Sequence, residues 1–357
     1  MPFTVLVINP GSTSTKIGAF EDGKELFTES VCHSAEDLAP FHTIASQFEF
    51  RERHIRDALA ARGFEAKRLS AVVGRGGLLK PIPGGVYRVN DAMTATMREA
   101  RFGEHASNLG ALIAEALGKE FGVPSFIADP VVVDELDPVA RVAGHKDFRR
   151  ISIFHALNQK ACARRWAREN GKAYEDADLI VAHMGGGVSV GLHRKGRVVD
   201  VNQALNGEGP FSPERSGTLP AGDLVKLCFS GRKTEKEVLK MITGQGGFVS
   251  LLGTNDMREV ERRHRAGDAE ATLYYEAFIY NIAKYVGAMA AANAGKLDAI
   301  ILTGGIAYGK EVVDGLVARC GWIAPVVVYP GEGELEALAA AGMRALSDPS
   351  CVMEYTA

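Results

Sequence analysis

The sequence predicts an α/β protein with two related halves. Apolar stretches of strand length alternate with longer stretches of helical spacing, a pattern typical of sheets covered by helices. Two turns rich in small residues, at 9–16 and 183–191, each follow an apolar strand and lead into a second strand. Because these turns lie about half a chain apart, we expect a duplicated domain.

The expected elements follow the same plan in both halves. In the first half, the strands are 3–9, 15–20, 24–31, 71–73 and 125–128, and the helices are 51–62 and 106–121. In the second half, the strands are 178–183, 188–193, 197–201, 299–302 and 324–329, and the helices are 156–170, 222–230, 234–242, 255–265, 269–293 and 335–346. A long loop at 202–221 is rich in Gly, Pro, Ser and Asn. We expect 1–148 and 332–357 to form one domain and 149–331 the other.

Composition excludes several classes of function. The chain has 357 residues, of which 46% are apolar and 24% charged, as in ordinary globular proteins. Its net charge of −3 provides no basic field, so neither nucleic acid nor an anionic membrane is an expected partner. No apolar run approaches the roughly 20 residues of a membrane span. Five scattered cysteines without a CxxC spacing fit a reducing compartment, and we expect a cytoplasmic protein.

The turn at 9–16 has the residue types of a phosphate site. Bare glycine backbone, hydroxyl groups and a lysine charge can converge on one anion. The candidate ligands are Asn9, Gly11, Ser12, Thr13, Ser14 and Lys16. The spacing of a Walker A loop is absent. The alternative is a hairpin whose hydroxyl groups only cap their own backbone.

Glycines also follow two strands of the second half. Three consecutive glycines stand at 185–187, after strand 178–183. Because glycine raises the entropy cost of ordering a chain, they indicate a need for bare backbone, although a bulge or tight turn is the alternative. A double glycine after strand 299–302 precedes a helix N-terminus expected near Tyr308, which favours an anion or a nucleotide. The candidates are His183, Gly185, Gly186, Gly187, Gly304, Gly305 and Ile306.

Two arginines and a carboxylate complete the inventory. Arg75 stands among glycines at a strand end, and Arg215 lies in the Gly- and Pro-rich loop. Guanidinium groups suit carboxylate and phosphoryl oxygens. Asp129 ends a strand beside Pro130, where its carboxylate can reach a magnesium ion or close an Asx turn. Since no nucleophile elbow or Rossmann fingerprint is present, this inventory favours phosphoryl transfer.

Five ordered motifs resemble the acetokinase family, within the superfamily of actin, sugar kinases and heat-shock chaperones. They are VINPGSTSTK at 7–16, FHALNQKA at 154–161, HMGGG at 183–187, PERSG at 213–217 and TGGIA at 303–307. The resemblance covers nearly the whole chain. It implies two duplicated ribonuclease H-like (actin-like ATPase) domains with a nucleotide cleft between them.

The resemblance also implies a carboxylate kinase that transfers the γ-phosphoryl group of ATP to butanoate, with Mg²⁺, giving butanoyl phosphate and ADP. Arg75 and Arg215 would hold the carboxylate and the moving phosphoryl group, and His155 would contact the γ-phosphoryl group. Asp129 would hold Mg²⁺ with Glu334 or Glu332.

The same resemblance divides the work between the domains. The N-terminal domain would take the acyl substrate and the phosphates, which Asn9 and Ser12 would face. The C-terminal domain would take the nucleotide, lined by the glycines at 185–187 and 304–305. A homo-oligomer is expected by resemblance alone.

Departures from the family pattern concern the acyl group. Acetate kinases have RVVHGG where this chain has Arg75 followed by Gly76 and Gly77, and we expect these glycines to leave room for a longer acyl tail. His105 and Phe154 are further pocket candidates. The second histidine of the acetate kinase motif FHGTSH is absent from FHALNQ at 154–159. Acetate, propionate or isobutyrate as substrate, and a non-catalytic nucleotide-binding module of the same fold, remain alternatives.

Overall fold

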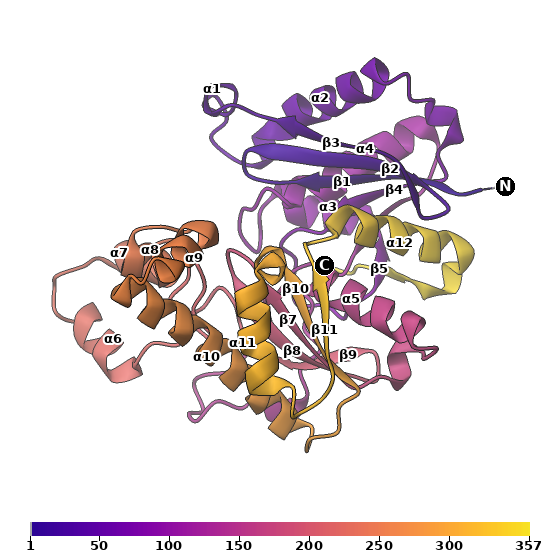
Figure 1. The fold of residues 1–357 in the computed structure, drawn as a ribbon. Helices are drawn as coiled ribbons and strands as arrows, with labels where there is room; N and C mark the ends of the chain where they lie inside the picture. Colours follow the sequence, from indigo (N-terminus) through magenta and orange to yellow (C-terminus); the bar gives the residue numbers. More distant parts are fainter. Residues whose placement is uncertain (1) are drawn as a thin grey trace. The chain divides into compact units, whose positions relative to one another are not determined.

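The computed structural model describes residues 2–357 and divides into two compact units (Figure 1). One unit runs to Val133 and takes up the chain again at Gly333–Ala357, and the other is Asp134–Glu332. Residues 134–148, which we expected in the N-terminal domain, belong to the second unit. The amide of Asp137 donates to the carbonyl of Val199, and buried Lys160 pairs with Glu135 at 2.8 Å. These bonds attach the segment to the second sheet.

The first unit contains a seven-stranded sheet in the order β12-β5-β6-β4-β1-β2-β3. Its strands are β1 (Thr4–Pro10), β2 (Ser14–Glu21), β3 (Lys24–Cys32), β4 (Ala71–Arg75), β5 (Val86–Arg88), β6 (Ser125–Ala128) and β12 (Val352–Glu354). Its helices are α1 (Ala35–Leu38), α2 (Phe48–Ala61), α3 (Asp91–Arg98), α4 (Asn108–Phe121) and α12 (Glu334–Ser347).

The second unit contains a five-stranded sheet in the order β11-β10-β7-β8-β9. Its strands are β7 (Leu179–Met184), β8 (Val188–Arg194), β9 (Arg197–Val201), β10 (Ala299–Gly304) and β11 (Val326–Pro330). Its helices are α5 (Ala156–Glu169), α6 (Ala221–Cys228), α7 (Glu235–Ile242), α8 (Gly247–Leu252), α9 (Met257–Arg265), α10 (Ala269–Ala292) and α11 (Lys310–Cys320).

The two sheets share one topology, which confirms the predicted duplication. In each, the first three strands form an antiparallel meander, and the first strand also pairs in parallel with a later one: β1 with β4, and β7 with β10. A further parallel strand follows, β6 beside β4 and β11 beside β10. Since parallel strands run the same way, the ends of β1 and β4, and those of β7 and β10, meet at one edge of each sheet.

Helices cover both faces of the first sheet. Neighbouring strand residues point to opposite faces. A Cβ on Gly74 of β4 would lie 2.1 Å from the carbonyl oxygen of Gly110 in α4, so this helix packs directly against the strand backbone. A Cβ on Gly342 of α12 would lie 2.8 Å from the side chain of Val73, the neighbour of Gly74. Hence α4 and α12 lie on opposite faces, and α12 returns the chain to the first unit.

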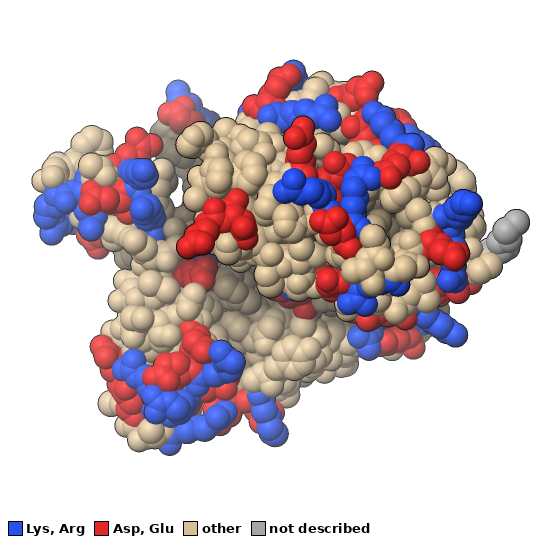
Figure 2. Space-filling model, turned by 90° about the horizontal axis from the view of Figure 1, so that it is seen from above, with Lys and Arg blue, Asp and Glu red and all other residues tan. Residues whose placement is uncertain are grey.

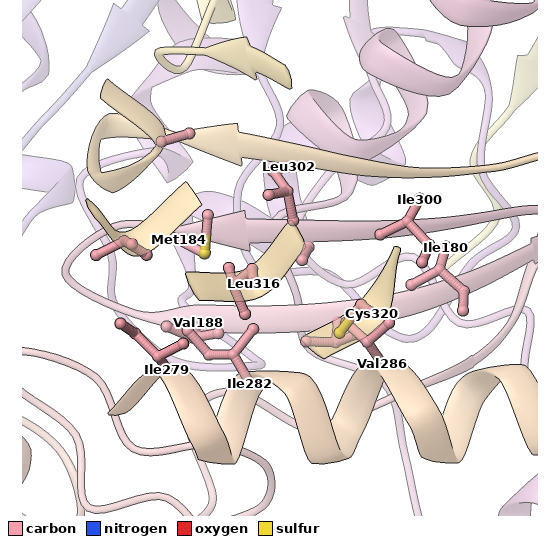
Figure 3. Close-up of a cluster of buried hydrophobic side chains, with 14 of the residues drawn as sticks. Ile180, Met184, Val188, Ile279, Ile282, Val286, Ile300, Leu302, Leu316 and Cys320 are labelled. Atoms are coloured by element: carbon pink, nitrogen blue, oxygen red, sulfur yellow. The ribbon is translucent and has the colours of Figure 1, made fainter. Parts of the chain in front are cut away.

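The core of the second unit also has two sides. On one side, α10 presents Ile279, Ile282 and Val286 at helical spacing to strand residues such as Ile180 and Ile300 (Figure 3). On the other, α5 packs its buried face, including Trp166, on the alternate strand residues. This alternation explains why the strands read as continuous apolar runs in the sequence.

The predicted strands are confirmed to within two residues, and so are the predicted helices except α2, which begins three residues earlier than expected. Several short elements were missed: α1, α3, β5, α8 and β12. The helix expected near Tyr308 begins at Lys310, after a 3₁₀ turn at Gly305–Tyr308. On the face drawn in Figure 2, Lys and Arg lie among Asp and Glu. Within residues 2–357, no helix has both the length and the apolarity needed to cross a membrane.

Candidate active site

In the first unit, three predicted residues meet at the ends of β1 and β4 and the start of α12. The side-chain nitrogen of Asn9 donates to Glu334 Oε2 (2.6 Å), and Arg75 Nη1 donates to Asn9 Oδ1 (3.2 Å). Arg75 Nη1 also lies 2.9 Å from Glu334 Oε1. Asn9, Arg75 and Glu334, which we call the first-sheet cluster, therefore hold one another in place at the sheet edge.

Asp129 belongs to the same edge. It directly follows Ala128 of β6, the residue that pairs with Arg75 of β4. Its side chain is buried, its amide donates to the carbonyl of Gly85 (2.9 Å), and its φ of +38° is unusual for a residue other than glycine. Strained backbone of this kind is concentrated at functional sites.

Asp129 and Glu334 supply carboxylates, the kind of protein ligand that Mg²⁺ takes. Mg²⁺ is usually held by one or two carboxylates together with phosphate oxygens and water, not by a complete protein cage. Among residues 2–357, no group of three or more His, Cys, Asp or Glu is arranged to hold a metal ion. The third candidate, Glu332, lies in the other unit, where its carbonyl accepts a hydrogen bond from Asn158 (2.5 Å).

The turn between β1 and β2 keeps its polar groups available. Its backbone closes through the amide of Gly11, which donates to the carbonyl of Ser14 (2.7 Å). Ser12 and Thr13 are exposed, and neither their hydroxyl groups nor that of Ser14 bond to another described residue. Lys16 is exposed on β2.

In the second unit, two glycine turns lie side by side. β7 and β10 pair in parallel, with Thr303 opposite His183, so both turns start at the same sheet edge. Gly304 has a φ of +88°, and a Cβ there would lie 2.3 Å from the carbonyl oxygen of Met184. A Cβ on Gly305 would meet nothing within 4 Å. Gly304 is thus needed for close packing of the turns, whereas Gly305 borders open space; buried Ile306 anchors the turn in the core.

Arg215 explains the need for bare backbone at Gly187. A Cβ on Gly187 would lie 2.0 Å from Nη1 and 2.4 Å from Cζ of Arg215. The guanidinium group donates to the carbonyl of Ala204 (3.1 Å), and burial lowers its pKa. The glycine turn and the arginine therefore form one structure. Gly185 borders His183, and Gly186 borders Glu214 without close contact.

His155 and His183 stack on each other, with ring centroids 3.8 Å apart and an interplanar angle of 10°. His155 Nδ1 lies 2.9 Å from the hydroxyl of Ser189, and His183 Nδ1 lies 2.8 Å from Asn158 Oδ1. Because Asn158 Oδ1 can only accept, His183 carries a proton on Nδ1. Both rings are thereby fixed at the end of β7.

A buried amide fixes the proton on His155. The side-chain nitrogen of Gln159 donates to the carbonyl of Ser189 (3.0 Å), which can only accept, and to the Ser189 hydroxyl oxygen (2.8 Å). That oxygen also accepts from the amide of His155 (3.5 Å). These two bonds favour a hydroxyl that donates to His155 Nδ1 and an imidazole that carries its proton on Nε2.

Sequence reasoning missed Gln159, Ser189 and Asn158. Gln159 takes the position of the second histidine of the motif FHGTSH. It also accepts at Oε1 from buried His193 (3.0 Å). In the sequence, Gln159 could be recognised only as a polar residue on the apolar face of a helix. That feature alone does not identify its hydrogen-bond partners.

The room for an acyl tail that we expected at Gly76 and Gly77 is filled by other residues. A Cβ on Gly76 would lie 2.6 Å from Cβ of Pro130, and one on Gly77 would lie 2.3 Å from Oδ1 of Asn108. Both glycines therefore allow close packing and leave no room for an acyl tail on that side. His105 lies near Arg75: burial first, and then the charge of Arg75, lower its pKa. Phe154 is buried in the second unit.

Comparison with known proteins places the chain in a family. The model of the acetokinase family matches residues 141–320. The chain is 56% identical to a probable butyrate kinase of Clostridium botulinum (strain Alaska E43 / Type E3) over 97% of its own length and 98% of the relative's. A second probable butyrate kinase, of Clostridium botulinum (strain Eklund 17B / Type B), is 55% identical over the same shares.

Solved structures show the fold. Porphyromonas gingivalis acetate kinase matches with a TM-score of 0.78 and 20% identity over 96% of this chain and 100% of that one. A propionate kinase from Francisella tularensis subsp. tularensis SCHU S4 matches with a TM-score of 0.69 and 18% identity over 94% and 98%. The predicted actin-like ATPase fold is thus confirmed. Since the family model matches half of the chain and two relatives are more than 50% identical to it, the chain belongs to the acetokinase family.

Proposed function

We propose that this protein is a butyrate kinase, which transfers the γ-phosphoryl group of ATP to butanoate and releases butanoyl phosphate and ADP. The observation that carries this proposal is the 56% identity to a probable butyrate kinase across 97% of the chain. As a member of the acetokinase family, the protein is a phosphotransferase that uses ATP and a carboxyl group as acceptor.

The chemistry needs no strong base, because the acceptor carboxylate is already a nucleophile. Catalysis then depends on positioning and on neutralising the charge of the moving phosphoryl group. In this proposal Arg75 orients the carboxylate, and Arg215 neutralises phosphoryl charge. His155 donates from Nε2 to a phosphoryl oxygen, which the hydrogen bonds of Ser189 and Gln159 favour.

We assign Mg²⁺ to the carboxylate of Asp129, with Glu334 as its second protein ligand. When bound, the ion would neutralise charge on the phosphate oxygens. Glu334 now pairs with Arg75, so this carboxylate links the metal site to the guanidinium that we assign to the substrate. Glu332 is the weaker candidate, since only its backbone has a defined contact.

The division of labour follows the two units. We assign the acyl substrate and the transferred phosphoryl group to the first-sheet cluster and the turn between β1 and β2. The nucleotide is assigned to the glycine turns at 185–187 and 304–305. A cytoplasmic location fits the use of ATP and the five unpaired cysteines, and a homo-oligomer stays a prediction.

The acyl group is tested by comparing kcat/KM for straight-chain acids of two to five carbons and for isobutyrate. Trapping the acyl phosphate with hydroxylamine measures the product. Each buried CH₂ contributes about 0.8 kcal/mol, or roughly fourfold, so we expect a graded rise to a maximum at butanoate. A maximum of kcat/KM at acetate or propionate would make that acid the preferred substrate. The absence of any acyl hydroxamate would favour a non-catalytic nucleotide-binding module.

A further inference from the structure

Arg51 of α2 is a fully buried guanidinium group beneath the turn between β1 and β2. Its Nη1 donates to the carbonyl of Gly11 (2.7 Å) and, at 3.3 Å, to the carbonyl of Ser14. Its Nη2 donates to the carbonyl of Ser12 (3.0 Å). Nε and Nη2 both donate to the side-chain oxygen of Gln47, which fixes the plane of the group (3.0 and 2.8 Å).

Within residues 2–357, the positive charge of Arg51 has no carboxylate as hydrogen-bond partner. All its hydrogen-bond acceptors among residues 2–357 are neutral oxygens: three carbonyls, the Gln47 amide and the Thr15 hydroxyl. Burial lowers its pKa, and no acid opposes that effect. The neighbouring His33 has a pKa lowered to about 4, by burial first and then by the charge of Arg51. A buried charge without a counter-ion costs several kcal/mol, so its retention needs a reason.

The contacts of Arg51 determine which way the turn faces. In a planar trans peptide the carbonyl and the following amide point in opposite directions. Because the carbonyls of Gly11 and Ser12 point at Arg51, the amides of Ser12 and Thr13 point away from it. Neither amide bonds to another described residue, and both side chains are exposed. The outer side of the turn thus presents two backbone donors and two hydroxyl groups.

We propose that Arg51 is a positioning residue that shapes and charges this turn for a phosphoryl group. It holds the carbonyls inward, so that the amides of Ser12 and Thr13 face the anion. Its positive charge lies behind the turn and becomes compensated when a phosphoryl group binds in front. The inference rests on the proposed function and adds a residue that does not itself touch the ligand.

Kinetics of two Arg51 variants test the proposal. Arg51→Met keeps the length of the side chain but removes the charge and the hydrogen bonds, and Arg51→Lys restores the charge alone. We expect Arg51→Met to raise KM for ATP and for butanoyl phosphate at least tenfold, with KM for butanoate within twofold of wild type. Arg51→Lys should recover part of the loss. Arg56→Met, at a half-buried position on the same helix that does not contact the turn, is the matched control and should leave all three KM values unchanged.

The results separate the possible failures. If Arg51→Met lowers only the amount of active enzyme, with all KM values unchanged, Arg51 is merely structural and the proposal is overturned. If the wild type forms no acyl phosphate, the proposed function fails instead. Should Arg51→Met not fold, amide exchange in the wild-type protein decides: inorganic phosphate should slow exchange at Ser12 and Thr13, and unchanged exchange at saturating phosphate would overturn the proposal.

Discussion

Substituting Gly187 with alanine should inactivate the enzyme by displacing Arg215, without unfolding it. The new Cβ would lie 2.0 Å from Nη1 and 2.4 Å from Cζ of Arg215. Favourable contacts between heavy atoms begin at about 3.5 Å, so the guanidinium group must move by more than about 1 Å. Gly187 does not have a positive φ, so the methyl group itself causes no backbone strain. The end of a flexible side chain moves, and the fold remains.

The expected loss follows from that displacement. A misplacement of about 1 Å in a catalytic site can cost about 100-fold in rate, which corresponds to about 2.7 kcal/mol of activation free energy. The assay is kcat/KM for hydroxamate formation from butanoate and ATP. Gly287→Ala, in α10, is the control: its Cβ would meet nothing within 4 Å, and alanine favours the helix by about 1 kcal/mol. This control should keep full activity and an equal or higher Tm.

A double-mutant cycle tests whether the effect passes through Arg215. Arg215→Ala should itself lower kcat by about 10³-fold, as for other arginines that neutralise a transferring phosphoryl group. In that background Gly187→Ala has no guanidinium group to displace and should cost less than threefold. An equal loss from Gly187→Ala in both backgrounds would refute this reasoning, and so would wild-type activity of the single variant.

Three further predictions concern single residues. Ser189→Ala removes the hydroxyl that fixes the proton of His155, so kcat should fall about tenfold with KM for ATP unchanged; Ser189→Thr should restore kcat. Glu334→Gln should raise the Mg²⁺ concentration for half-maximal activity about tenfold at unchanged Tm. The lowered pKa of His33 means that its protonation opposes folding. The free energy of unfolding should therefore fall by up to about 3 kcal/mol between pH 6.5 and 4, and urea titrations of His33→Gln should show a smaller fall.

The sequence was sufficient for the elements that depend on local pattern. The meander strands and the long helix α10 (Ala269–Ala292) carry clear periodicity, and the Gly-rich turns mark where strands end. Short elements such as β5 (Val86–Arg88) and β12 (Val352–Glu354) were missed, because three residues are too few to show alternation. The two strands are neighbours at one edge of the first sheet, where segments far apart in the sequence pair with each other.

The interpretation of individual glycines was less successful, because the sequence does not show what lies beside them. Gly76 and Gly77 follow Arg75 and suggested space for an acyl tail. In the structure, Pro130 and Asn108 fill that space, and both come from segments far away in the sequence. Arg51 was missed for a related reason. The helix that carries it was predicted, but nothing local indicates that the side chain reaches under the turn at 11–14.

The two glycine-rich turns occupy equivalent places in the duplicated sheets, yet different contacts explain them. In the second unit, the guanidinium group of Arg215 occupies the place of a Gly187 side chain, so the glycine is required by a residue that we assign to the chemistry. In the first unit, a Cβ on Gly11 would make only ordinary van der Waals contact, at 3.4 Å from the carbonyl oxygen of Ser14, and Arg51 holds the turn through its carbonyls. Gly11→Ala should therefore affect activity much less than Gly187→Ala. An equal loss in the same hydroxamate assay would mean that the first turn also needs bare backbone, and that Arg51 alone does not account for its shape.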